Sequence, residues 1–202
     1  MARVKLTKTE LKAQTDALRR FERFLPMLLL KKQQLQGEIA GIAAKAEAVA
    51  ARERAVRAEL DRWVGLLATD EALLSGLVKV KGVRKGTANI AGVTIPTFES
   101  VDTEVGEADA WATPAWIDDA VETTKKVVSL RYEREVYDEQ RRLVAEELQQ
   151  TSQRVNLFEK VRIPECKEAI RVIKIALGDE QAAAVTRGKI AKGRAVREED
   201  AA

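Results

Sequence analysis

Apolar residues recur at sevenfold spacing along the first third of the chain. One series starts at Phe21, and a second series, offset by four residues, starts at Leu11. The first series is Phe21, Leu28, Leu35, Ile42, Val49, Val56 and Trp63, and the second is Leu11, Leu18, Leu25, Lys32, Ile39, Ala46, Glu53, Leu60, Leu67 and Leu74. Alternating spacings of three and four place these side chains on one face of a helix, the pattern of a coiled-coil seam. The pattern predicts a long helix interrupted in its seam only by Lys32 and Glu53.

A second helical stretch starts near Pro114, which suits the first position of a helix capped by Thr113. Its expected seam is less regular: Val127, Leu130, Arg134, Tyr137, Arg141, Val144, Leu148, Thr151, Val155 and Phe158. Arg134 and Arg141 need acidic partners there, or must leave the seam. Gly178 predicts the end of this helix, with a short final helix after it.

The segment between the helical stretches has the alternation of β-strands. Apolar and polar residues alternate over residues 78–81, and residues 93–95 and 98–101 are also strand-like. Residues 89–92 supply a turn in which Gly92 can adopt positive φ. We expect a small β-hairpin that projects from the closed end of the helical pair. Trp111 and Trp116 are expected to pack at the junction, with a partner anchor as the alternative.

These patterns predict a mainly α fold, a long antiparallel two-helix coiled coil with a small central β-hairpin. The expected parts are residues 1–78, residues 79–113 and residues 114–202. The last part includes a basic terminal segment.

Two helix-interrupting prolines are expected to lie side by side. If Leu77 faces Pro114, Pro26 faces Pro164, and Lys5 comes close to Thr186. A proline inside a helix removes one backbone hydrogen bond and bends the axis. We therefore expect a bend of the helical pair at Pro26 and Pro164.

Composition and spacing argue against catalysis. The chain has no histidine and one cysteine, Cys166, which excludes Ser-His and Cys-His pairs and internal disulfides. Residues 82–87 lack the order of a phosphate-binding loop and are expected to form a glycine-bearing turn. Residues 118–119 and 146–147 are adjacent carboxylates, which point in different directions on a helix. We expect no catalytic residues, no cofactor and no metal.

The sequence was also examined for membrane-spanning and signal-peptide patterns, and neither is found. No apolar stretch has the roughly 18 residues of a membrane span, and the N-terminus has no signal-peptide pattern. We expect a soluble, cytoplasmic protein with no direct membrane insertion.

Positive charge gathers at both ends of the chain. Residues 187–197 carry five basic and no acidic residues. The candidate contact residues are Lys5, Lys8, Arg187, Lys189, Lys192 and Arg194. The plain interpretation is a solvated helix end, and the sharper one is insertion into an acidic or carbonyl-lined protein collar. A nucleic-acid-binding arm is a third possibility, but the cluster has no aromatic residues for base stacking. We expect no nucleic acid.

Several collinear motifs resemble the D subunit of the V/A-type rotary ATPases. The most specific is residues 153–159: Gln153, Arg154, Val155, Asn156, Leu157, Phe158 and Glu159. Residues 163–165, residues 177–192, a first block at residues 25–35 and a central block at residues 89–101 are also similar to that family. The resemblance covers nearly the whole chain.

The resemblance implies a non-catalytic central rotor shaft that carries torque between a catalytic head and a membrane rotor ring. Its partners would be the A and B subunits of the head, the F subunit, and the C subunit, which links the shaft to the ring. It implies that the chain lies peripheral to the membrane as part of the complex. A prefoldin-like coiled-coil chaperone is the alternative, since such chaperones also combine paired helices with β-hairpins. Its apolar tips differ from the basic end of this chain.

Overall fold

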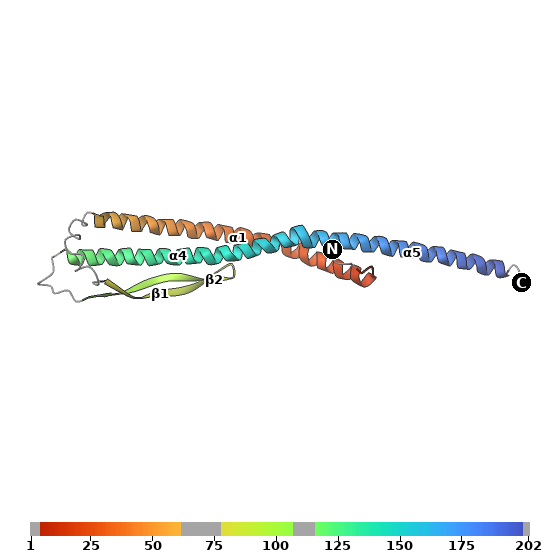
Figure 1. Ribbon diagram of the computed structural model, residues 1–202, viewed down its shortest axis with the longest axis horizontal. Coiled ribbons are helices and arrows are strands. Elements are labelled where there is room, and N and C mark those ends of the chain that lie inside the picture. Colours follow the sequence, from red (N-terminus) through yellow and green to blue (C-terminus); the bar gives the residue numbers. More distant parts are fainter. Residues whose placement is uncertain (1–4, 62–77, 107–115, 200–202) are drawn as a thin grey trace. The chain divides into compact units, whose positions relative to one another are not determined.

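A computed structural model describes residues 5–61, 78–106 and 116–199 (Figure 1). Helix α1 is Lys8–Asp61, strands β1 and β2 are Val78–Ile90 and Val93–Val105, and helix α4 is Ile117–Leu157. A π-helical turn, η1, covers Phe158–Arg162 and leads into helix α5, Ile163–Glu199. The predicted mainly α class with a two-stranded hairpin is confirmed. Thr113, Pro114 and Trp111 lie outside the described residues.

The chain divides into two compact units, each described by itself. Unit 1 consists of Met1–Leu30 with Thr151–Ala202, and unit 2 consists of Lys31–Gln150. The expected division at residues 78 and 113 was drawn along the sequence, and it stays a prediction.

In unit 2, α1 and α4 run antiparallel. Lys31 of α1 forms an ion pair with Glu147 of α4 at 2.6 Å, and Arg52 forms one with Glu133 at 3.2 Å. Residue numbers therefore rise along α1 as they fall along α4. In both pairs, the α4 residue comes several positions earlier in the sequence than the alignment of Leu77 with Pro114 predicts.

In the described part of unit 2, the two apolar series of α1 form the seam as predicted, while Trp63, Leu67 and Leu74 lie outside the described residues. Leu35, Ile42 and Val49 of the first series are fully buried. Ile39 and Ala46 of the second series are half-buried, and Glu53 is buried with 4% exposure. The polar interruption at Glu53 is thus inside the seam, not at its edge.

Each of the two arginines at predicted seam positions of α4 adopts one of the two expected alternatives. Arg134 donates a hydrogen bond to the buried Glu53 carboxylate at 3.0 Å. Arg141 instead leaves the seam, is exposed, and pairs with Asp138. Val136 and Gln140 are buried although the sevenfold pattern omits them. Gln140 donates to the backbone carbonyl of Pro96, so this side of α4 faces the hairpin.

Strands β1 and β2 pair antiparallel through a two-residue turn. Ala91 and Gly92 both have positive φ, 50° and 86°, which matches the twist that tight hairpin turns require. The Asn89 side-chain oxygen accepts a hydrogen bond from the Gly92 N–H at 3.0 Å. Residues 82–87 lie within β1, where the pairing register shifts after Val80 and after Arg84. The glycine-bearing turn expected there is therefore wrong, because residues 82–87 all pair with β2. The two register shifts skip Lys81 of β1 and Glu99 of β2, as β-bulges do.

The hairpin packs against the helices of unit 2. Ile95 shares one buried cluster with Leu35, Ile42 and Val144, and Lys85 pairs with Glu139 of α4 at 3.1 Å. Figure 1 shows both strands lying along α4. The expectation that the hairpin projects from the closed end is wrong. A lone two-stranded hairpin is at best marginally stable in water, so its apolar face is buried against the helices.

In unit 1, the first part of α1 contacts the π turn η1 and α5. Thr7 caps α1, since its hydroxyl accepts a hydrogen bond from the Glu10 N–H at 3.2 Å. Facing contacts join Phe21 to Phe158, with ring centroids 4.9 Å apart, and Glu22 to Lys167 at 3.4 Å.

Helix α5 does not stop where its sequence predicts. It continues through Gly178 to Glu199. The expected end at Gly178 is therefore wrong. A glycine inside a helix costs about 1 kcal/mol relative to alanine. The high helix propensity of the alanine-rich sequence that follows offsets this cost.

Candidate functional site

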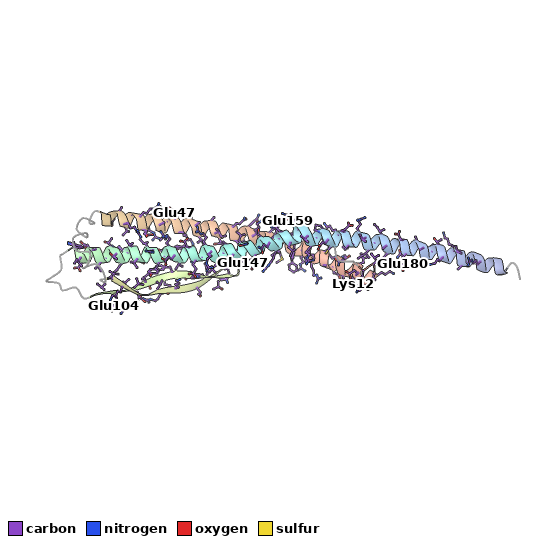
Figure 2. All side chains as sticks on the ribbon, viewed as in Figure 1. Lys12, Glu47, Glu104, Glu147, Glu159 and Glu180 are labelled. Carbon is purple, nitrogen blue, oxygen red and sulfur yellow. The ribbon has the colours of Figure 1, made fainter. Side chains whose placement is uncertain are left out.

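The basic terminal part of α5 is an unpacked helix. Every residue from Gly178 to Arg194 is exposed, including the predicted contact residues Arg187, Lys189, Lys192 and Arg194. Side chains project to both sides of α5 around Glu180 (Figure 2). Among the ion pairs of the described residues, none involves these four basic side chains. These four side chains therefore face solvent.

Such a helix has little intrinsic support. Isolated helices of fewer than about 15 residues are marginal in water, and most helices in proteins depend on packing of one face. Val185 and Ile190 are also more than half exposed in this stretch. Residues 178–194 therefore form a helical stretch that no described part of the chain packs against.

The N-terminal basic residues are placed separately. Lys5 precedes α1 and Lys8 begins it, and both are exposed. Within unit 1, α5 continues beyond the N-terminal end of α1 (Figure 1). No described contact joins Lys5 or Lys8 to the Arg187 group. That these residues form one contact surface stays a prediction.

The motif at residues 153–159 divides into packing and surface residues. Val155 is buried with 2% exposure, and the Phe158 ring packs against the Phe21 ring at a tilt of 52°. The remaining motif residues are exposed, and these are Gln153, Arg154, Asn156, Leu157 and Glu159. The motif ends inside the π turn, so it marks a change of helix geometry as well as a seam.

Both prolines lie in unit 1. Pro26 is inside α1, and Pro164 is the second residue of α5, directly after the π turn. Both side chains are exposed. A bend at these residues stays a prediction.

Sequence reasoning did not single out an apolar surface in unit 1. Large apolar side chains near Pro26 and in and beside the π turn are between 41% and 61% exposed, and they are Phe24, Met27, Leu29, Leu30, Leu157 and Val161. Residues 24–30 are apolar nearly all around the helix, which was the available signal. Exposed apolar residues of this kind favour protein contacts over catalysis.

The carboxylates and the thiol that were considered as catalytic candidates are either ion-paired or buried. Glu147 pairs with Lys31, and Glu146 pairs with Arg142 at 2.9 Å. Cys166 is buried, and burial, helped by the nearby Glu165 carboxylate, raises the pKa of its thiol. Its nucleophilic thiolate form is therefore disfavoured at neutral pH. Within residues 5–61, 78–106 and 116–199, no cluster of three acidic or cysteine side chains could hold a metal ion.

One cleft in unit 2 lies between the hairpin and the helices. Its volume is about 310 Å³, and Ile42, Ile95, Phe98 and Tyr137 are among its lining residues. Its charged residues are Glu38, Lys45 and Glu133. Glu133 is already paired with Arg52 at 3.2 Å. The lining combines packing residues with solvated charges, and no nucleophile sits beside a base.

Comparison with known proteins assigns the family. The sequence model described as the D subunit of ATP synthase matches residues 10–193. The V-type ATP synthase D subunit of Borreliella burgdorferi is 43% identical over 192 residues, which cover 95% of each chain. The proteins of the same name from Chlamydia muridarum and Chlamydia felis are 35% and 32% identical, and the alignments cover 95% of this chain and 95% and 93% of those proteins. The chain therefore belongs to the family of ATP synthase D subunits.

Proposed function

We propose that this chain is the non-catalytic central-stalk subunit of a V-type ATP synthase, acting as a rotor shaft. It transmits torque between ATP hydrolysis or synthesis in the catalytic head and ion translocation in the membrane ring. The observation that carries the proposal is the match to the D-subunit model over residues 10–193, with relatives of that name from V-type ATP synthases aligned over 95% of the chain.

The packing of the helical pair suits the transmission of torque. A shaft must resist sliding and unwinding of one helix against the other. In unit 2, the seam residues Leu35, Ile42 and Val144 interlock with Ile95 of the hairpin in one cluster. Ion pairs between α1 and α4, such as Lys31 with Glu147, fix the longitudinal register. Directional side-chain contacts of this kind support stiffness along the pair.

The exposed basic end of α5 supports contact with the head. We place Arg187, Lys189, Lys192 and Arg194 inside a collar formed by the A and B subunits, with Lys5 and Lys8 contributing at the same end. Clustered positive charge attracts acidic or carbonyl-lined surfaces over several ångströms and speeds association. Full exposure of residues 178–194 supports this, because no part of the described chain packs against them.

Two further subunits are proposed to contact the shaft. The F subunit binds the shaft, and the C subunit connects it to the membrane rotor ring. The chain then lies at the cytoplasmic side, peripheral to the membrane. None of the described helices combines the length and apolar character of a membrane span. Asymmetry for rotation comes from the unequal seams of the helices and from a bend at Pro26 and Pro164.

The prefoldin-like alternative receives no support from the comparisons. Exposed apolar residues such as Phe24, Met27 and Leu30 could in principle hold an unfolded client. The family match runs over 10–193 and is to the D subunit of ATP synthase, and the free end of α5 is basic. A chaperone role is not proposed.

Affinity purification of the tagged full-length chain from its own host tests the assignment. We expect nucleotide-binding head subunits and one small stalk subunit to co-elute in fixed ratio. A second tagged chain with Ile95→Asp, which disrupts the unit 2 core, is the control for nonspecific capture. Elution of the wild-type chain alone, or with unfolded clients instead of head subunits, would overturn the proposal.

A further inference from the structure

The apolar seam of unit 2 does not by itself select one alignment of α1 against α4. The buried apolar seam residues of α1, which are Leu35, Ile42 and Val49, recur every seven residues and are all aliphatic. A slip of one helix along the other by seven residues therefore exchanges one aliphatic side chain for another at these positions. Heptad seams of this kind depend on polar residues at single positions to specify their register.

Glu53 rejects a slip in one direction only. Its carboxylate is 4% exposed and accepts a hydrogen bond from Arg134 of α4. A slip that brings Val127 to the place of Arg134 would leave the buried carboxylate without its α4 partner, which is costly. A slip in the other direction brings Arg141 to the same place and would preserve the pair. Glu53 therefore tolerates this second slip.

Gln140 of α4 supplies a contact that rejects both slips. Its side chain is 5% exposed, and its amide donates a hydrogen bond to the Pro96 carbonyl of β2. The residues seven positions before and after it are Glu133 and Glu147. An ionised carboxylate has no hydrogen to donate, so either slip would set a negative charge against the Pro96 carbonyl. A buried charge without a donor is strongly unfavourable.

The Pro96 carbonyl is held in place relative to α1. Ile95 precedes Pro96 in β2 and is 3% exposed. Two of the three other members of its buried cluster, Leu35 and Ile42, belong to α1. The acceptor is therefore fixed to α1 through the hairpin, whereas the donor belongs to α4. The hydrogen bond between them depends on how far the two helices are displaced along each other.

Exposed ion pairs add less to the choice of register. Lys85 of β1 pairs with Glu139 of α4, but both side chains are at least 40% exposed. Glu146 would replace Glu139 in the slip that Glu53 tolerates, so this pair discriminates in one direction only. Surface ion pairs contribute little, because water screens them and long side chains lose entropy in forming them. The buried Gln140 therefore carries most of the discrimination.

We propose that the β1–β2 hairpin is a register gauge for the helix pair of unit 2. Anchored on α1 by Ile95, it accepts only the alignment that places Gln140 against the Pro96 carbonyl, and Glu53 with Arg134 supports the same alignment. Its value to the molecule rests on the proposed shaft function, whereas the register itself does not. A slip of seven residues under torque would displace α4 by about 10 Å along α1, and the gauge prevents that slip.

Moving the amide along α4 tests the gauge without changing the net charge. Gln140→Glu with Glu147→Gln relocates the donor by seven residues, in the direction that Glu53 tolerates. Gln140→Glu with Glu133→Gln is the matched control, because it relocates the donor in the direction that would cost Glu53 its α4 partner. Each exchange also removes one ion pair between α1 and α4, so the two variants lose comparable surface contacts.

Distances between two spin labels on the full-length chain report the register. Cysteines for labelling replace the exposed Ala40 of α1 and Glu135 of α4, and Cys166→Ala removes the native thiol. We expect the control exchange to keep the distance of the parent chain, and the exchange with Glu147 to lengthen it by up to about 10 Å. An unchanged distance in the exchange with Glu147 would overturn the proposal. The same lengthening in the control would also overturn it, because it would reflect a general loosening of the pair.

Single substitutions decide the question if an exchange fails to fold. Glu147→Gln leaves Gln140 in place and adds a second donor seven residues away, so both registers become available. We expect a minor population at the longer distance in Glu147→Gln and none in Glu133→Gln, with helix content unchanged by circular dichroism. One identical distance in both would contradict the gauge. Because the measurement needs no partner, the register can fail this test while the co-purification experiment succeeds, and the reverse.

Discussion

At the scale of single residues, Glu53 is the least expected member of the α1 seam. Its position in the sevenfold series is otherwise apolar, yet its side chain is 4% exposed. It accepts hydrogen bonds from Arg134 at 3.0 Å and forms an ion pair with Arg57 at 2.7 Å. A buried carboxylate persists in a protein when cations and donors surround it in this way. The pair also explains why Arg134 occupies a seam position of α4.

Replacing Glu53 with glutamine removes the charge and keeps the shape. We expect the free energy of unfolding to fall by about 1–3 kcal/mol, because Arg134 and Arg57 lose their charged acceptor. Chemical denaturation followed by circular dichroism measures the loss. The paired change Glu53→Leu with Arg134→Leu should be neutral or stabilising, since apolar groups of similar size often substitute for a buried ion pair.

An exposed ion pair provides the matched comparison. Glu47 pairs with Arg54 on the surface of α1, where both side chains are more than two-thirds exposed. Glu47→Gln should change the free energy of unfolding by less than about 0.5 kcal/mol. If Glu53→Gln proves equally mild, the buried pair contributes little, and the seam tolerates its polar position for another reason.

At the scale of elements, the hairpin is part of the core and not an appendage. Ile95 of β2 is 3% exposed and contacts the cluster that contains Leu35, Ile42 and Val144. Gln140 of α4 donates to the Pro96 carbonyl beside it. The hairpin therefore helps to hold α1 against α4.

Ile95→Ala should destabilise the chain by about 2–5 kcal/mol, because it leaves a cavity between the hairpin and the helices. Val80→Ala in β1 is the control, since Val80 is already 39% exposed and its truncation should cost well under half as much. Thermal and denaturant unfolding of both variants measures the difference. A hairpin that projects freely would give two small and similar effects.

How far the sequence could predict these elements depends on the kind of signal. The seam of α1 was predictable because a long sevenfold repeat has one structural interpretation. The strands and the turn at Gly92 were predictable from alternation and turn chemistry. The packing of the hairpin was not, because alternation shows that one face is buried without showing against what. The burial of Val136 and Gln140 could not be predicted for the same reason.

The π turn was hidden for a different reason. Pro164 indicated an interruption, but a proline is compatible with a kink, a helix end or a wide turn. The helix end predicted at Gly178 was wrong because glycine propensity is a weak local preference. The candidate contact residues at the termini came from charge alone, which shows a surface and not its partner.

At the scale of the whole molecule, the distribution of charge matters more than its net value. The chain carries 35 basic and 32 acidic residues, so its net charge of +3 is small. Many surface charges of unit 2 are paired, as in Arg84 with Asp102 and Lys85 with Glu139. Arg187, Lys189, Lys192 and Arg194 form no ion pair with any side chain that the structure describes. The end of α5 is therefore where long-range electrostatics can guide assembly.

Neutralising this end tests that role. Changing Arg187, Lys189, Lys192 and Arg194 to glutamine should slow association with the purified catalytic head by about ten-fold or more at low salt, since charge steering accelerates encounter by that order. The difference should shrink as salt screens the charges. Stopped-flow association at several salt concentrations measures both effects. Helix content and the denaturation midpoint should stay near wild-type values, because residues 178–194 are exposed and support no core.

A variant that loses the same number of positive charges elsewhere distinguishes steering by the end of α5 from an effect of the chain's net charge. Glutamine at Lys45, Lys79, Lys126 and Arg142 removes four exposed positive charges from unit 2. If net charge alone governed encounter, both variants would slow equally. If the end of α5 enters the head, only its own neutralisation removes the salt dependence, because screened attraction acts over about 10 Å at 0.1 M salt. Equal behaviour of the two variants would place the contact surface outside the basic end.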